Sequence, residues 1–251
     1  HKCPENTVCC LGNNIINAVF CDKTGIVWLA TDCCGVNKFV PERMEMAYRD
    51  TDLRSPSKLS QNRVWSFWED SYGVLWIATS DGLKQLVKSS NSFIHHSSNP
   101  DDPTTLSNDA VTIIYQDSKE RLWVGTEDGL NLYNRQSGTF KRFRFNPNNA
   151  ASLSDNGIVA IEEDHQGSIW IGTRIGGLNK YDPKTGAFER IDHDPNKVSS
   201  MANSSIMAIL ESASKTSLWI GTFNGGLVEY DYASQQFIHH LHDHGLSLIH
   251  I

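Results

Sequence analysis

Apolar residues recur along the chain in one pattern at nearly regular intervals. The phrases "RLWVGTEDGLNLYN" (121–134), "SIWIGTRIGGLNKYD" (168–182) and "SLWIGTFNGGLVEYD" (217–231) are near-copies of one another. Aligning the chain on the tryptophan of this phrase gives a row with successive steps of 48, 47, 47 and 49 residues: Trp28, Trp76, Trp123, Trp170 and Trp219. A period of this length indicates one supersecondary unit used five times.

Each copy predicts four strands. An alternating apolar run leads into an acidic turn, as in "GIVAIEEDHQG" (157–167), and the tryptophan strand, a "GGLNKYD" strand and a run such as "GAFERIDHDP" follow. The turn reads Asp-x-x-Gly in the first, second and fourth copies, where Asp caps its own turn and Gly accepts a positive φ. The third copy has Glu120 in the Gly place, and the fifth has "SASKTS".

Both faces of the tryptophan strand are apolar. In "LWVGT", Leu122 and Val124 point to one face and Trp123 and Gly125 to the other, so the sheet is covered on both sides. A small residue two positions after each tryptophan leaves room for a neighbouring sheet: Ala30, Ala78, Gly125, Gly172 and Gly221. No segment shows a helical period longer than two turns. We therefore predict an all-β fold, a β-propeller of five four-stranded blades with the tryptophans buried between them.

The repeat also sets boundaries. An irregular segment (1–10) precedes blades at 11–58, 59–105, 106–152, 153–200 and 201–245. The final "LSLIHI" (246–251) fits no repeat position and is expected to be an artificial tail.

Composition narrows the function classes. A formal net charge of −7, with Lys and Arg scattered along the chain, argues against a nucleic-acid partner. No apolar run approaches the ~20 residues that span a bilayer, and the chain begins at His1 without a signal-peptide pattern, so it reads as an excerpt. Six cysteines lie within the first 34 residues, and disulfides, free thiols and a metal site all stay open for them: Cys3, Cys9, Cys10, Cys21, Cys33 and Cys34.

Chain topology locates a candidate site. Connections in a four-stranded meander alternate between two rims, so the loops between second and third strands share a rim with the long links between copies. Variable loops on a rigid scaffold tend to carry function. The loop tips offer carboxylates, a guanidinium and an amide suited to a polar ligand such as a sugar: Asp32, Asp81, Asp128, Arg174 and Asn224. The alternative is that they are ordinary solvated turn residues.

The threonines and histidines of the repeat have simpler structural interpretations. The threonine that opens each of these loops is expected to belong to the scaffold. "FIHH" occurs at 93–96 and 237–240, and His240, His242 and His244 alternate onto one strand face, where a metal is conceivable. Solvated edge-strand histidines are the simpler interpretation, and we predict no metal or cofactor.

The repeat also carries a family resemblance. The pattern "D-x-x-G-x-[LI]-W-[IV]-G-T-x-x-G-G-L-N-x-Y-D", followed by "S-L-S-x-N" at 152–156, resembles the two-component regulator propeller repeat from about Leu11 to Gly245. This resemblance implies the periplasmic or extracytoplasmic sensor of a membrane-anchored bacterial receptor such as a hybrid histidine kinase. It also implies a small-molecule or oligosaccharide ligand, a receptor homodimer, a transmitter outside this segment, and a larger ring of which this chain is a partial arc. The first copy departs from the pattern, with Cys34 at a Gly position.

Three functions follow from these observations. A non-catalytic ligand sensor is favoured, because the chain has no nucleophile, paired-carboxylate or phosphate-loop constellation. A propeller lyase or hydrolase would need unlike catalytic groups converging at the central channel. A protein-interaction scaffold would use the same rim.

Overall fold

The structure, a computed structural model, describes residues 15–32, 35–41, 45–49, 63–87, 89–90, 92–191, 200–201 and 203–240. Its regular structure over these residues is entirely β, with twenty strands in five four-stranded antiparallel sheets. The chain divides into two compact units, His1–Arg142 and Phe143–Ile251. The end segments 1–10 and 246–251, His242, His244 and all the cysteines except Cys21 lie outside the described residues.

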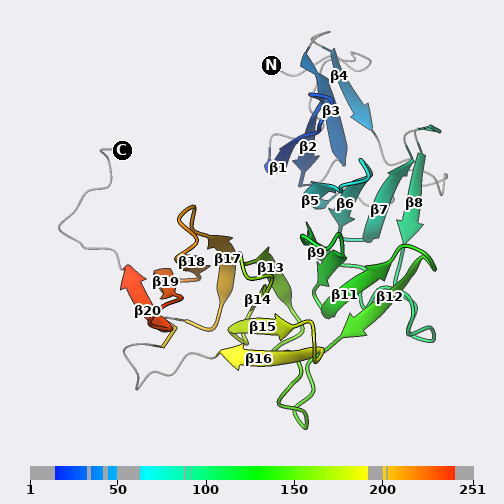
Figure 1. Ribbon diagram of the computed structural model, residues 1–251. Coiled ribbons are helices and arrows are strands. Elements are labelled where there is room, and N and C mark those ends of the chain that lie inside the picture. The colour runs from blue at the N-terminus through cyan, green and yellow to red at the C-terminus, as the bar shows by residue number, and fades with distance from the viewer. Residues whose placement is uncertain are drawn as a thin grey trace, which may run out of the picture. The chain divides into compact units, whose positions relative to one another are not determined.

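The first unit contains three blades, each a meander in which consecutive strands pair (Figure 1). Its strands are β1 (Ile16–Cys21), β2 (Val27–Thr31), β3 (Val36–Val40), β4 (Glu45–Arg49), β5 (Val64–Glu69), β6 (Leu75–Thr79), β7 (Gly82–Val87), β8 (Ser92–His96), β9 (Val111–Gln116), β10 (Leu122–Thr126), β11 (Gly129–Asn134) and β12 (Thr139–Phe143, whose last residue falls in the second unit). The first strands of consecutive blades, β1, β5 and β9, lie side by side.

The second unit contains two blades of the same design. Its strands are β13 (Ile158–Glu163), β14 (Ile169–Thr173), β15 (Leu178–Asp182), β16 (Ala187–Ile191), β17 (Ile206–Glu211), β18 (Ser217–Thr222), β19 (Gly226–Asp231) and β20 (Gln236–His240). Here too the first strands of the two blades, β13 and β17, are neighbours. The β-propeller fold expected from the sequence is therefore confirmed.

A buried aspartate ties the first turn of a blade to its tryptophan. In the blade that begins with β13, Asp164 Oδ1 accepts the backbone N–H groups of Gln166 and Ser168 at 3.0 and 2.9 Å, and Oδ2 accepts Trp170 Nε1–H at 2.8 Å. The same aspartate–indole bond, six residues apart, joins Asp22 to Trp28, Asp70 to Trp76 and Asp117 to Trp123 at 2.7–2.8 Å. The turn expected from Asp-x-x-Gly thus also fixes the tryptophan ring.

In the third blade a glutamate replaces the Gly of this turn and keeps its left-handed backbone conformation. Glu120 occupies the Gly place and adopts a φ of 61°, a left-handed conformation that a side chain disfavours. Its carboxylate accepts a hydrogen bond from the Tyr72 hydroxyl at 2.7 Å, which links the third blade to the second.

A second recurring contact joins consecutive blades at the same turn. The backbone N–H that follows the turn aspartate donates to the side chain that ends the next blade's first strand. Lys23 N bonds Glu69 Oε2 at 2.8 Å, and Ser71 N bonds Gln116 Oε1 at 2.7 Å. This bond fixes the position of each blade relative to the next. The acceptor is the residue that directly precedes the next blade's turn aspartate.

The tryptophan strands form the core. Every residue of β6, β10 and β14 is buried, as expected for a sheet covered on both faces. A Cβ atom added at Gly172 would come within 2.5 Å of Ile206 Cγ2, so the small residue admits a side chain of the next blade. Trp76, Trp123 and Trp170 have no exposed surface.

Trp219 differs from the other tryptophans of the row because it is only half-buried. Its turn offers Ser212 in place of aspartate, and the Ser212 hydroxyl accepts Thr216 N and Ser217 N. Cross-strand pairing places Leu210, Trp219, Glu229 and Ile238 in one row on a single face of this last blade. Leu210 is 62% exposed on that face.

Removing the turn carboxylate is expected to cost stability. Asp164→Ala leaves Trp170 Nε1–H and two turn amides without their acceptor, so the free energy of unfolding should fall by about 3 kcal/mol. Denaturant unfolding followed by tryptophan fluorescence measures this change. Asp182→Ala is the control, because its exposed carboxylate also caps a turn, and it should cost no more than about 1 kcal/mol. Equal losses in the two variants would contradict the account.

The exposed apolar face of the last blade is expected to drive self-association. Leu210, Leu227 and Ile238 are 62%, 43% and 47% exposed there, and contiguous exposed apolar area favours association. The 251-residue chain should therefore run above its monomer mass of 28.1 kDa in light scattering coupled to gel filtration. The double variant Leu210→Glu/Ile238→Glu should shift it towards monomer. A native chain that is monomeric at all concentrations would contradict this expectation.

Candidate functional site

The loops between second and third strands are built on one hydrogen bond. In every blade, the threonine that ends the second strand donates its hydroxyl hydrogen to the carbonyl oxygen of a glycine that closes the loop. The bonds are Thr31–Gly35, Thr79–Gly82, Thr126–Gly129, Thr173–Gly177 and Thr222–Gly226, at 2.7–3.0 Å. The threonine row is therefore scaffold, as the sequence predicts, and the residues between Thr and Gly differ from loop to loop.

The long links share the rim with these loops. Glu127 N donates to Ala110 O at 3.0 Å, and Phe223 N donates to Ser205 O at 2.9 Å. The rim expected from the topology is thus confirmed in each unit.

Two side chains anchor the link that precedes the third blade, and two equivalent side chains anchor the link that precedes the fourth. Asn131, on the third strand of its blade, accepts Ser107 N and donates to Ser107 Oγ, both at 2.9 Å. Arg142, on the fourth strand, donates to the carbonyl oxygens of Thr105 and Leu106, each at 2.8 Å. Asn179 and Arg190 bond the link at 146–154 in the same way. The "S-L-S-x-N" signature is therefore a link anchored to its blade, with its leucine fully buried.

Three predicted site residues lie in the first unit. Asp32 pairs with Arg63, with Oδ1 and Nε 3.1 Å apart. Asp81 lies beside His95, whose Nε2 is 2.7 Å from the Asp81 carbonyl oxygen, and its carboxylate is 3.7 Å from Lys84 Nζ. Asp128 is half-buried at its loop tip, and its backbone N–H donates to Thr126 Oγ1 at 3.2 Å.

The other two predicted residues lie in the second unit. Arg174 is exposed, and its backbone N–H donates to Gly157 O at 2.8 Å. Asn224 is exposed with a φ of 60° at the tip of its loop. Ile175 and Phe223, beside them, are 72% and 57% exposed. Because Asp128 and Arg174 belong to different units, their pairing around one ligand stays a prediction.

Lys84 is a charged residue that the sequence analysis did not single out. It occupies the place that Asn131 and Asn179 occupy in later blades, and its side chain is fully buried. Burial disfavours the ammonium form and lowers the pKa of Lys84 to about 8, against the attraction of Asp81 and Asp109. The signal in the sequence was the lysine in "GLKQL", where the third and fourth copies have "GLN".

The histidines of the second blade are not simply solvated. The His96 ring packs against Trp76, Tyr133 and Phe140 at centroid distances of 5.5–5.8 Å. Burial, together with the positive charges of His95 and Lys84, lowers the pKa of His96 to about 4, so this ring is neutral at pH 7. The interpretation as solvated edge-strand histidines is therefore wrong for His96.

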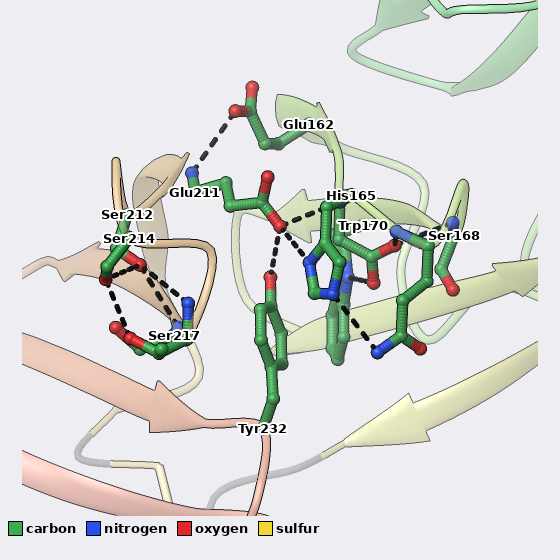
Figure 2. A network of polar contacts seen from close by, with 12 residues as sticks. Glu162, His165, Ser168, Trp170, Glu211, Ser212, Ser214, Ser217 and Tyr232 are labelled. Carbon is green, nitrogen blue, oxygen red and sulfur yellow. Dashed lines mark hydrogen bonds and ion pairs between the residues drawn. The ribbon is translucent and has the colours of Figure 1, made fainter.

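A polar network at the opposite rim of the second unit is the main competing site (Figure 2). His165 Nδ1 and the Tyr232 hydroxyl lie 2.8 and 3.1 Å from the same oxygen, Glu211 Oε1. Burial alone would raise the pKa of Glu211, but hydrogen bonds from His165 and Tyr232 outweigh it and lower the pKa. Burial raises the pKa of nearby Glu162.

The same network contains the recurring hydrogen bond that joins consecutive blades. His165 N donates to Glu211 Oε1 at 2.7 Å, which matches the Lys23–Glu69 and Ser71–Gln116 bonds of the first unit. Its central interaction is thus part of the repeat scaffold. The rim of second-to-third loops therefore remains the candidate site, as predicted from the sequence.

The described parts of the chain contain no cluster of three or more His, Cys, Asp or Glu side chains arranged to hold a metal ion. The His240, His242 and His244 hypothesis lies mostly outside those residues, and His240 pairs with Glu229 at 3.3 Å. Among the described residues, no helix is long and apolar enough to cross a membrane.

Fold, turn and anchored link together define a propeller built from one repeated blade, and this repeat matches a known family at three places. The family model described as "Two component regulator propeller" matches residues 58–81, 105–128 and 152–174. The chain therefore carries the repeat of this family, and the resemblance noted in the sequence is confirmed. No curated protein matches the chain.

Solved structures share the fold. The chain is similar to the extracellular domain of a hybrid two-component system, BT3049, from B. thetaiotaomicron, with 24% identity and a TM-score of 0.77 over 91% of this chain and 30% of that one. A one-component system, BT4673, from the same organism gives 23% identity and a TM-score of 0.72, with 93% and 32% covered. The chain thus spans about a third of the length of these domains.

A propeller of another function is also similar. A catalytically inactive variant of virginiamycin B lyase from Staphylococcus aureus shares 14% identity and a TM-score of 0.64, over 92% of this chain and 71% of the lyase. At these identities the likeness establishes the fold alone.

The buried lysine predicts a particular pH dependence. Because the pKa of Lys84 is lowered in the folded chain, the unfolded chain binds more protons between about pH 8 and pH 10, and stability should rise with pH across that window. Lys84→Met should remove this rise and stabilise the chain at pH 7 by on the order of 3 kcal/mol. Urea unfolding of the native chain and of Lys84→Met at several pH values tests this. Tyrosine titration in this pH range affects both proteins equally, so the difference between them reports on Lys84. Parallel pH profiles would contradict it.

Proposed function

We propose that this chain is the ligand-sensing propeller of a bacterial signal-transduction receptor, lies on the extracytoplasmic side, and passes its signal to a transmitter in another part of the receptor. The repeat match and the fold shared with extracellular domains of B. thetaiotaomicron regulators support this assignment. We propose that further blades cover the exposed face of the last blade in the longer receptor.

One observation carries the proposal. All five second-to-third loops close with the same Thr–Gly hydrogen bond, and their tips carry three carboxylates, one guanidinium and one amide. A constant scaffold that presents varied donors and acceptors suits recognition of one asymmetric polar ligand, such as a glycan. Chemistry on a substrate would instead require a converging acid, base and nucleophile or metal, so we propose that this segment is not an enzyme.

The alternatives have weaker support. A lyase function rests on the fold likeness to virginiamycin B lyase, and unrelated functions recur on one fold. A protein-interaction scaffold would use the same rim. A sensor and a protein-interaction scaffold differ in the size of the partner that the rim residues recognise, a small ligand in the first case and a protein surface in the second.

Loop-tip substitutions in the full-length receptor test the proposal. Arg174→Ala or Asp128→Ala should shift the ligand concentration for half-maximal signalling upward about tenfold and leave the free energy of unfolding within about 0.5 kcal/mol. Thr173→Val is the matched control, because it removes the buried hydroxyl that bonds Gly177. It should lower stability by about 1–2 kcal/mol. Normal signalling by both loop-tip variants would refute the site.

A further inference from the structure

Trp65 is a tryptophan outside the buried row. Strand β5 has a bulge between Val64 and Ser66, and Trp65 is the extra residue. Val64 pairs with Thr79, which opens the loop to Asp81, so the bulge lies at the rim of second-to-third loops. Bulges re-aim side chains, and 40% of Trp65 is exposed although its neighbour Val64 is fully buried.

Charged groups flank this indole on the same rim. Arg63 Cζ lies 5.4 Å from the centre of the Trp65 ring. Arg63 Nε is 3.1 Å from Asp32 Oδ1, and the Arg63 carbonyl oxygen accepts Ser80 N at 3.2 Å. The ion pair stays accessible, with 49% of the Arg63 side chain and 30% of the Asp32 side chain exposed. The cluster thus joins the loop of the first blade to the loop of the second.

An exposed indole beside a paired carboxylate and guanidinium matches the chemistry of a pyranose ring. The C–H face of a sugar packs on an aromatic surface, while its hydroxyl groups donate to a carboxylate and accept from a guanidinium. Resting on the glycan-sensing function proposed above, we infer that Trp65, Arg63 and Asp32 form a sugar-stacking subsite for an uncharged hexopyranose or pentopyranose unit of an oligosaccharide.

Local charge favours an uncharged sugar. Asp81, Glu127 and Asp128 occupy the neighbouring loop tips of this unit, and the Arg63 charge is already opposed by Asp32. Bringing a uronate or sulfate to this rim would place its negative charge near these carboxylates, which disfavours its binding. The chain's net charge of −7 acts in the same direction.

Tyr72 is the informative comparison. It is 61% exposed, and Arg135 Cζ lies 4.5 Å from its ring centre, so like Trp65 it is an exposed aromatic side chain with a cation contact. It lies in the Asp70–Gly73 turn, which is at the opposite rim. Its hydroxyl bonds Glu120, and Arg135 bonds Asp70. Removing Tyr72 therefore deletes an exposed aromatic side chain without touching the proposed subsite.

Binding of defined oligosaccharides tests the inference. The 251-residue chain is immobilised at low density on a biosensor, which limits self-association, and probed with cellotetraose, mannotetraose, xylotetraose and tetragalacturonate. At least one neutral tetrasaccharide should bind, and tetragalacturonate should bind about tenfold more weakly at low salt. Trp65→Ala should weaken neutral binding by about tenfold or more, Trp65→Phe by less, because a smaller ring keeps part of the stacking surface. Tyr72→Ala should leave binding unchanged.

The outcomes separate this inference from the broader proposal. Binding that survives Trp65→Ala and Trp65→Phe but is lost in Arg174→Ala would overturn the subsite and keep glycan sensing. Stronger binding of tetragalacturonate than of every neutral probe would overturn the uncharged-sugar assignment. Absence of binding by all four probes would overturn the subsite, whereas ligand sensing as such is tested separately by Arg174→Ala and Asp128→Ala in the full-length receptor.

Discussion

The hydrogen bond from the tryptophan indole to the buried turn aspartate is the constraint on which each of the first four blades depends. One carboxylate satisfies the amides of its own turn and the only polar atom of the largest core side chain. A tryptophan can therefore be buried completely between apolar sheets without an unpaired N–H group, which would otherwise cost free energy. With the ring fixed, the strand that carries it, the threonine at its end and the loop beyond are fixed as well.

The two rims of a blade therefore differ in role, one holding the sheets together and the other presenting variable loops. At one rim, aspartates and the backbone-to-side-chain bonds between blades, such as His165 to Glu211, are committed to holding the sheets in register. At the other, each loop is closed by a threonine hydroxyl and a glycine carbonyl group, so this closing bond does not use the side chains at the loop tips. Chemical variety can accumulate there with little effect on stability, and the bulge at Trp65 adds an aromatic surface to it.

The sequence predicted the parts of the structure that repeat. Period, strand number, the fully apolar tryptophan strand and the shared rim of loops and links all follow from patterns present in several copies. It did not predict the indole partner of Asp164, the anchoring of Ser107 by Asn131, or the half-burial of Trp219, because these depend on side-chain contacts across strands. Lys84 and Trp65 were missed for a different reason. Each is a departure in one blade, and a consensus read across copies suppresses single departures. His96 was expected to be solvated, because its burial depends on Tyr133 and Phe140 of the next blade.

Hydrogen exchange of the indole N–H groups tests the central constraint most directly. In the Leu210→Glu/Ile238→Glu background, with tryptophan labelled by ¹⁵N, the Nε1–H signals of Trp28, Trp76, Trp123 and Trp170 should exchange slowly, because each bonds a buried carboxylate. The exposed Trp65 and half-buried Trp219 should exchange fast, and Asp164→Ala should move Trp170 into the fast group. Equal exchange of all indoles, or a Trp170 signal that stays protected in Asp164→Ala, would contradict the account.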